Sequence, residues 1–88
     1  MTLATQWRPN LSPTVLLRYD HVRDDDLLVL PERVVVLGGS AAAVLRLCDG
    51  TREVWEIVEE LAESFPGAPV ETEVPAFLHR VLEEGWLR

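Results

Sequence analysis

Cysteine is almost absent from this chain: Cys48 is the only one among 88 residues. A single thiol excludes an internal disulfide and is typical of a protein of the reducing cytoplasm. No apolar run is long enough to cross a bilayer, and no charged-then-apolar leader is visible, so we expect a cytoplasmic protein without a membrane partner. Basic residues are also scarce. Eight of them against fifteen acidic residues give a net charge of −7, which disfavours binding to nucleic acid.

The groups that catalysis requires do not converge in the sequence. His21 and His79 have no carboxylate or thiol at the spacing of a metal site, and both are expected on the solvated surface. Cys48 falls on the apolar side of a predicted helix, where an inert buried thiol is expected. The glycine pair 38–39 lacks the spacing and the lysine of a phosphate loop, and the acidic run 24–26 lacks the further ligands of a calcium loop. The sequence therefore predicts a binding protein with no enzyme activity, cofactor or metal.

The segment 31–50 organises the rest of the chain, because a run of β-branched residues passes through the glycine pair into a helix. Val34, Val35 and Val36 show no polar alternation, so both faces of this strand are expected to be covered. Ser40 is the expected N-cap of the helix, which should run from 41 to 48 and end at the Asp-Gly pair 49–50.

Two more strands are expected before this segment. Residues 15–20 alternate in polarity and predict a half-exposed strand, whereas 27–30 are wholly apolar and predict a central one. Short connections favour an antiparallel meander with the second strand in the middle. Residues 1–13 should form an irregular N-terminal arm whose Trp7 covers the core.

Two amphipathic helices are expected after the first. Thr51 is the expected cap of the second, and the third should start near Thr72, tolerate Pro75 in its first turn and end at Gly85. Residues 1–88 thus predict a single α+β domain, a three-stranded antiparallel sheet followed by three helices, similar to a winged helix-turn-helix.

Two kinds of partner are compatible with that architecture. A winged helix-turn-helix usually binds DNA through a basic helix, but both later helices here are rich in glutamate, the wrong sign for phosphates. The third strand instead offers an edge of Arg33 followed only by apolar residues, which suits a partner that adds as a strand. The competing interpretation is that the third helix, or a second copy of the chain in a homodimer, covers this edge.

Seven short motifs resemble those of the PqqD family, the peptide chaperones of pyrroloquinoline quinone biosynthesis. They are Trp7-x-Pro9-x-Leu11, Leu17-Arg18-Tyr19-Asp20, Pro31-Glu32-Arg33-Val34-Val35-Val36-Leu37, Ser40-Ala41, Leu47-Cys48-Asp49-Gly50-Thr51, Glu56-Ile57-Val58 and Val74-x-x-Phe77-Leu78. The resemblance covers nearly the whole chain. It implies binding of a PqqA-like precursor peptide and its presentation to a PqqE-like radical S-adenosylmethionine enzyme, which cross-links a glutamate and a tyrosine of the precursor.

The resemblance also implies a binding site. The peptide would add beside the third strand, in a groove shared with the third helix. The residues carried over are Arg33, Val34, Val35, Val36 and Leu37 on the strand, and Phe77, Leu78, Arg80, Val81 and Glu84 on the helix. The acidic face of the second helix, Glu56, Glu59 and Glu63, is either solvated surface or a dock for a basic patch of the enzyme. A leader-binding domain for another modified peptide is the alternative, and DNA binding is less favoured.

Overall fold

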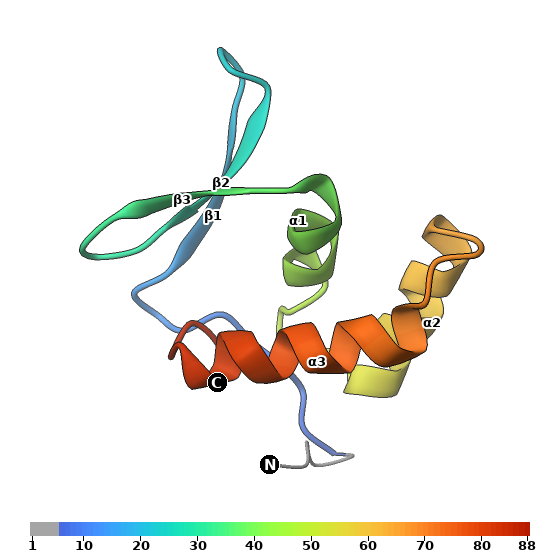
Figure 1. The fold of residues 1–88 in the computed structure, drawn as a ribbon. Helices are drawn as coiled ribbons and strands as arrows, with labels where there is room; N and C mark the ends of the chain where they lie inside the picture. Colours follow the sequence, from blue (N-terminus) through green and yellow to red (C-terminus); the bar gives the residue numbers. More distant parts are fainter. Residues whose placement is uncertain (1–5) are drawn as a thin grey trace.

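Residues 6–88 are described by the structure, a computed structural model, and they form three strands followed by three helices (Figure 1). The strands are β1 (Leu16–Asp20), β2 (Asp25–Val29) and β3 (Val34–Leu37), and the helices are α1 (Gly39–Arg46), α2 (Val54–Ser64) and α3 (Val70–Glu83). The sheet is antiparallel with the order β1-β2-β3. The predicted α+β class, the element order and the central second strand are confirmed.

The four largest fully buried side chains of the core come one from the central strand and one from each helix. These are Leu28, Leu45, Ile57 and Leu78, all 0–1% exposed. Burial of each contributes about 1.5–3 kcal/mol relative to an exposed position. The four side chains belong to one cluster, so they hold the three helices against one face of the sheet. No helix among residues 6–88 is long and apolar enough to cross a membrane.

Several predicted boundaries were wrong by one or two residues. α1 begins at Gly39 with Gly38 as its N-cap, so Ser40 lies inside the first turn, and the helix ends before Cys48. β2 begins at Asp25 rather than at residue 27, because pairing with Asp20 extends the hairpin through the acidic run. The sharp turn between β1 and β2 is made at Asp24, whose φ is 57°.

The starts of α2 and α3 also differ from prediction. Glu53, not Thr51, is the N-cap of α2, and it forms a capping box with Glu56. α3 begins two residues before Thr72, at Val70. Pro75 therefore lies in the second turn and not the first, where its missing N–H removes one helical hydrogen bond.

The expectation that both faces of β3 are covered was wrong. Val35 and Leu37 pack against the core, whereas Val34 and Val36 are 56% and 60% exposed. The helices cover only one face of the sheet, and β2 is the only element in extensive contact with β3 among the described residues. An uninterrupted apolar strand therefore ends up at an edge, with every second side chain in solvent.

The N-terminal arm is fastened to the body by backbone pairing. Asn10 pairs with Asp49 and Leu11 with Leu87 as isolated bridges, and Asn10 exchanges hydrogen bonds of 3.1 and 2.8 Å with Arg88. Trp7 packs against the core, as expected. The first five residues of the predicted arm lie outside the described part of the chain.

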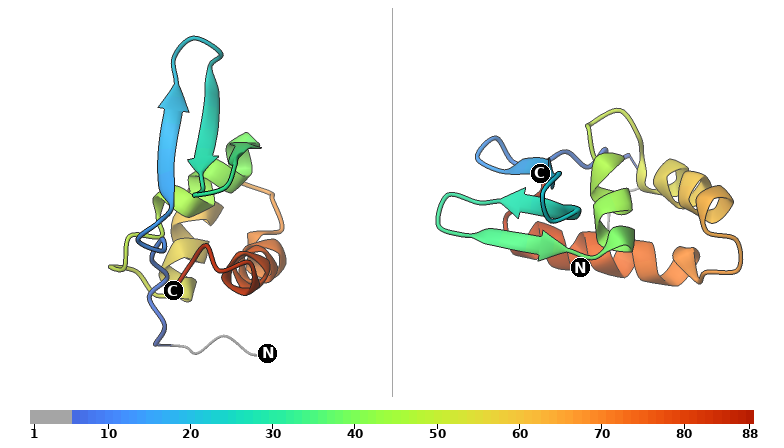
Figure 2. Two further views of the ribbon diagram at one scale, coloured as in Figure 1. Left: turned by 90° about the vertical axis from the view of Figure 1, so that its left-hand side faces the viewer. Right: turned by 90° about the horizontal axis from the view of Figure 1, so that it is seen from above.

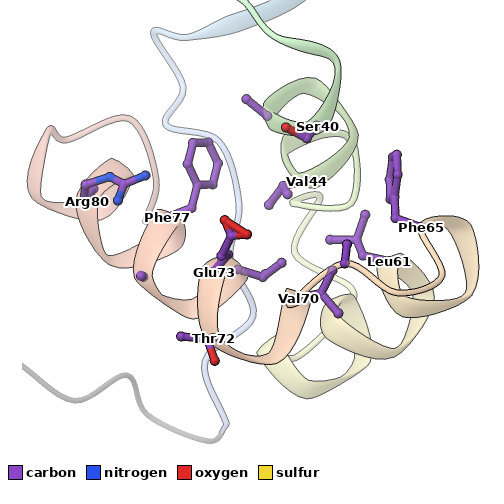
Figure 3. Close-up of a pocket in the computed structure, with 13 residues that line it drawn as sticks. Ser40, Val44, Leu61, Phe65, Val70, Thr72, Glu73, Phe77 and Arg80 are labelled. Carbon is purple, nitrogen blue, oxygen red and sulfur yellow. The ribbon is translucent and has the colours of Figure 1, made fainter.

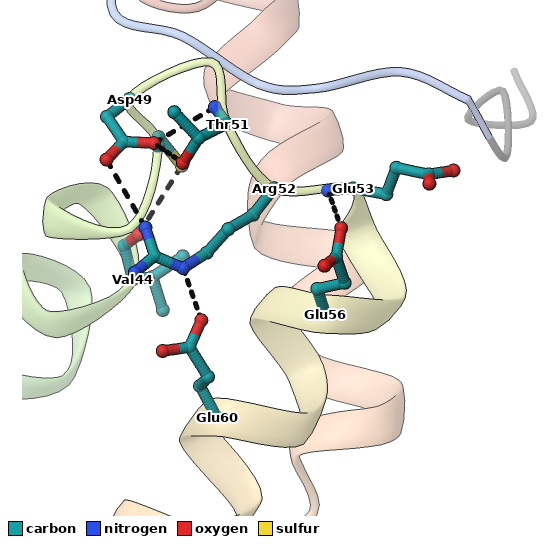
Figure 4. A network of polar contacts seen from close by, with 8 residues as sticks. Val44, Asp49, Thr51, Arg52, Glu53, Glu56 and Glu60 are labelled. Carbon is teal, nitrogen blue, oxygen red and sulfur yellow. Dashed lines mark hydrogen bonds and ion pairs between the residues drawn. The ribbon is translucent and has the colours of Figure 1, made fainter.

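The connection between α1 and α2 is held by a polar network (Figure 4). The Asp49 carboxylate accepts hydrogen bonds from the backbone N–H and the hydroxyl of Thr51. Arg52 reaches back to Asp49 and forward to Glu60 on α2, so one guanidinium joins the loop to the helix. The hydrogen bonds from Thr51, aided by Arg52, hold the pKa of Asp49 below its usual value. Glu60 raises the pKa of Arg52.

Gly50, between Asp49 and Thr51, is a position where a side chain would be strained. Its φ is +84°, its N–H donates to the Pro9 carbonyl at 2.9 Å, and a Cβ there would lie 3.2 Å from Nδ2 of Asn10. We expect Gly50→Ala to destabilise the protein by about 1–2 kcal/mol, a fall in Tm of roughly 5–10 °C in a domain of this size.

The matched control for this substitution is Gly39→Ala. Gly39 begins α1, and a Cβ there would meet nothing within 4 Å. Its Tm should be unchanged or slightly raised, because alanine favours the helix. Thermal unfolding followed by circular dichroism compares the two variants. Equal melting temperatures would contradict the strain assigned to Gly50.

Candidate functional site

The hydrogen-bonding direction of β3 follows from its register with β2. The Leu30 N–H donates to the Arg33 carbonyl at 2.8 Å, which makes this a hydrogen-bonded pair at the hairpin end. Pair types alternate along an antiparallel ladder, so Val35 opposite Leu28 is also a hydrogen-bonded pair. Val34 and Val36 lie in the non-bonded pairs between them. Their N–H and C=O groups therefore point away from β2, toward the free edge of the sheet.

β3 and α3 run in opposite directions along the same side of the molecule (Figures 1 and 2). At one end the Arg33 guanidinium lies 5.8 Å from the Trp86 ring, just past the end of α3. At the other end, β3 leads through the glycine pair into Ser40, which lines a cavity together with residues from the first half of α3. The chain just before β3 thus lies near the C-terminal end of α3, and the chain just after β3 lies near its first half.

The cavity lies at the junction of the three helices and holds about 360 Å³ (Figure 3). We call it the junction pocket. It is lined by Ser40, Ala41, Val44, Leu61, Phe65, Ala68, Val70, Thr72, Glu73, Val74, Ala76, Phe77 and Arg80. Four of these, Val44, Leu61, Val70 and Val74, are 3–7% exposed and form an apolar floor. The charged and hydroxyl groups belong to side chains that are largely exposed, so the polar part of the pocket is its rim.

α3 presents a second stripe beside its buried one. Glu73, Ala76, Phe77 and Arg80 follow the spacing i, i+3, i+4, i+7 and all line the junction pocket. The Arg80 guanidinium lies 5.9 Å from the Phe77 ring, so the cation and the aromatic side chain stand together on this stripe. α3 therefore contributes one face to the core and the neighbouring face to the junction pocket.

The residues carried over by resemblance fall into two groups. Leu78 and Val81 are 0% and 3% exposed and belong to the hydrophobic core, so their side chains are not accessible from the groove. Phe77 is half-buried, and Arg80 and Glu84 are exposed. On the strand, Arg33, Val34 and Val36 are exposed while Val35 and Leu37 are half-buried.

Of the thirteen residues that line the pocket, only Phe77 and Arg80 were predicted from the sequence as contacts. Ser40 was expected to be a helix cap and not a contact. The signal that could have found Glu73 and Ala76 is the i, i+3, i+4, i+7 stripe that runs from Glu73 to Arg80. It was missed because Phe77 is its only large apolar side chain.

None of the other groups considered for chemistry lines the junction pocket. Cys48 is 2% exposed, and burial, with a smaller contribution from Asp49, raises the pKa of its thiol to about 12, which fits the inert thiol expected. His79 was predicted to be solvated, but its side chain is half-buried. Its Nε2 lies 3.3 Å from the Glu83 carboxylate. Asp26 in the acidic run forms an ion pair with Arg46. Within residues 6–88, no three His, Cys, Asp or Glu side chains group as metal ligands would.

A family model described as coenzyme PQQ synthesis protein D (PqqD) matches residues 14–87. The chain belongs to the PqqD family. The match includes all three strands and all three helices. It begins after the N-terminal arm, so the fastening of that arm through Asn10 is a feature of this chain outside the family match.

Curated relatives in the PqqD family have similar lengths. The chain is 30% identical over 88 residues to the PqqA binding protein of Methylococcus capsulatus, covering 100% of this chain and 95% of that protein. It is 42% identical over 69 residues to the PqqA binding protein of Xanthomonas oryzae pv. oryzae, covering 76% of this chain and 75% of the relative.

A solved structure shares the fold. The PqqD part of Methylobacterium extorquens PqqCD, determined in solution by NMR, superposes with a TM-score of 0.77 at 30% sequence identity. The superposition covers 99% of this chain and 95% of that one. That PqqD truncation is described as a functional, stand-alone recognition element for ribosomally synthesised and post-translationally modified peptides.

Proposed function

We propose that this chain is a peptide chaperone of pyrroloquinoline quinone biosynthesis. It binds a PqqA-like precursor peptide by strand addition to β3 and presents it to a PqqE-like radical S-adenosylmethionine enzyme. The relatives named PqqA binding proteins support the peptide as partner. The observation that carries strand addition is the outward direction of the backbone N–H and C=O groups of Val34 and Val36. The chain itself performs no chemical step in this proposal.

The hydrogen bonds of such a ladder are too few to hold the peptide alone. Two outward residues, each exchanging two hydrogen bonds with the peptide, give four bonds. At about 1 kcal/mol net each they contribute about 4 kcal/mol, which only offsets the association cost of at least about 4 kcal/mol. A Kd of 1 μM corresponds to about 8 kcal/mol. The difference must come from side chains of the peptide in the groove between β3 and α3.

DNA binding, the alternative for a winged helix-turn-helix, is disfavoured by the charges on the helices. On α3 the exposed cation Arg80 stands among Glu71, Glu73 and Glu83. On α2 the exposed charges are glutamates, and the one nearby arginine, Arg52, is already paired with Asp49 and Glu60. A phosphate backbone would meet a negative surface on both helices.

Proline substitution tests the edge, because proline removes one N–H. Val34→Pro and Val36→Pro each delete an outward N–H, so we expect at least a tenfold loss of peptide affinity with a near-native Tm. Val35→Pro deletes an inward N–H opposite Leu28 and should lower the Tm substantially. The measurement is a fluorescence titration with labelled PqqA peptide, run in parallel with labelled duplex DNA, together with thermal unfolding.

Three results would contradict the proposal. Equal destabilisation by the three prolines would mean that β3 is not the free edge. Normal peptide binding by folded Val36→Pro would place the peptide elsewhere. Strong, salt-sensitive duplex binding without peptide binding would favour the DNA alternative. Size-exclusion chromatography of the free protein shows whether it is instead a homodimer paired through β3.

The enzyme partner is proposed to dock on the outward face of α2. Glu59 and Glu63 are exposed one turn apart and follow Trp55, which is 56% exposed on the same stripe. Glu56 has a structural task instead, since its side chain accepts the Glu53 backbone N–H at 2.9 Å. Of the three glutamates expected at a dock, two are therefore free to meet a basic patch.

Neutralising this face should slow association with the enzyme. We expect Glu59→Gln/Glu63→Gln to reduce the association rate of peptide-loaded protein with PqqE severalfold at low salt, because opposite charges steer encounter. Peptide affinity should not change. The matched control is Glu71→Gln/Glu83→Gln, which changes the net charge equally on α3. If both double variants slow association equally, or if neither slows it, the α2 face is not the docking surface for the enzyme.

A further inference from the structure

We infer that the face of the sheet opposite the helices, here called the outer face, also selects the peptide. Two alternate residues of the added strand place apolar, preferably β-branched, side chains beside Val34 and Val36 on that face. This inference rests on the proposed function, since it concerns a peptide that already pairs with β3. It extends that function, because the groove between β3 and α3 can read only the side chains that point toward the helices.

The register of the sheet defines the outer face. Leu17, Leu28 and Val35 stand in one cross-strand row and belong to the core or pack against it. Side chains alternate between the two faces along each strand, so the rows before and after this one point away from the helices. The outer face therefore consists of Leu16, Val29 and Val34 in one row and Arg18, Leu27 and Val36 in the next.

The outer face is apolar and open to solvent. Five of its six side chains are aliphatic, and Leu16, Val34 and Val36 are 48–60% exposed. Leu27 and Val29 on the central strand are half-buried, but they neither belong to the core nor pack against it. Their cross-strand neighbours on β1 and β3 shield them, because paired side chains on one face touch. Val34 and Val36 have such a neighbour on one side only, and their other side faces the free edge.

The backbone direction of Val34 and Val36 decides where an added strand places its side chains. Residues directly opposite each other on neighbouring strands have their side chains on the same face of the sheet. The peptide residues that pair with Val34 and Val36 therefore point to the outer face, whether the peptide runs parallel or antiparallel to β3. These two peptide residues are separated by one residue, which points toward α3.

The neighbouring side chains set the chemistry at these two peptide positions. An aliphatic or β-branched side chain beside Val34 extends the apolar row from Leu16 and removes from water surface that is exposed in the free protein. In the other row the only charge is Arg18, three strand spacings or about 14 Å from the backbone of the added strand. A charged peptide side chain therefore gains no ion pair within either row and leaves the valines uncovered.

The test varies the outer side chains and keeps the backbone of β3. Val34→Thr/Val36→Thr replaces one methyl group of each side chain by a hydroxyl, and Val34→Ile/Val36→Ile lengthens each side chain by one carbon. All three residue types are β-branched and both positions are exposed, so the Tm should stay near native. Val22→Thr is the matched control, since Val22 is 94% exposed in the turn between β1 and β2. The probe is fluorescein-labelled synthetic PqqA of Methylococcus capsulatus.

The two double variants should change peptide affinity in opposite directions. The threonine pair should weaken binding about three- to tenfold, and the isoleucine pair should strengthen it about twofold, as cross-strand contacts of this size allow. Val22→Thr should leave the affinity unchanged. In an alanine scan of the peptide, two residues separated by one other should lose less affinity against the threonine pair than against the original chain. The residue between them should lose the same factor against both.

Two results would overturn the inference while leaving the proposed function intact. One is equal peptide binding by the threonine pair, the isoleucine pair and the original chain, since strand addition depends on backbone groups that all three retain. The other is full additivity between the threonine pair and every alanine variant of the peptide. Failure of the unsubstituted protein to bind the peptide would instead overturn the proposed function, and the inference with it.

Discussion

The central strand of the sheet imposes the constraint on which the site depends. β2 is paired on both sides, so β1 and β3 each have one partner and one open edge. The register of the β2–β3 hairpin, set where Leu30 bonds to Arg33, then decides which residues of β3 face outward. Val34 and Val36 direct both their backbone groups to the open edge. Such groups must be satisfied by water or by another chain, and the apolar side chains beside them favour another chain.

α3 carries two neighbouring stripes of side chains, one buried in the core and one exposed. Val74, Leu78 and Val81 fill the core, and the neighbouring stripe from Glu73 to Arg80 lines the junction pocket together with Ser40, which follows β3 in the chain. The C-terminal end and the middle of the helix are fixed from different directions. Ser12 donates to the carbonyls of Gly85 and Trp86 just past the end of α3. The core under Leu78 fixes its middle. The N-terminal arm therefore supports the C-terminal end of α3.

Sequence reasoning was most successful where periodicity is strong. The alternation in β1, the apolar run of β2 and the stripes of α2 and α3 gave the class, the order and the central strand. It failed where one pattern is compatible with two environments. Val34–Val36 look equally like a covered strand and like an open edge, since the run contains no polar residue that would reveal the exposed side. Leu78 and Phe77 are adjacent apolar residues on one helix, and only the packing separates core from groove. Which residues of β3 direct their backbone groups outward depends on a hairpin hydrogen bond that cannot be read from the amino-acid composition.

Amide hydrogen exchange on β3, measured with and without PqqA peptide, tests the central claim most directly. In the free protein the amides of Val35 and Leu37 should already be protected by their bonds to β2, and those of Val34 and Val36 should exchange fast. On binding, Val34 and Val36 should gain protection while Val35 and Leu37 change little. Unchanged exchange at Val34 and Val36 in a peptide-saturated sample would contradict strand addition at this edge.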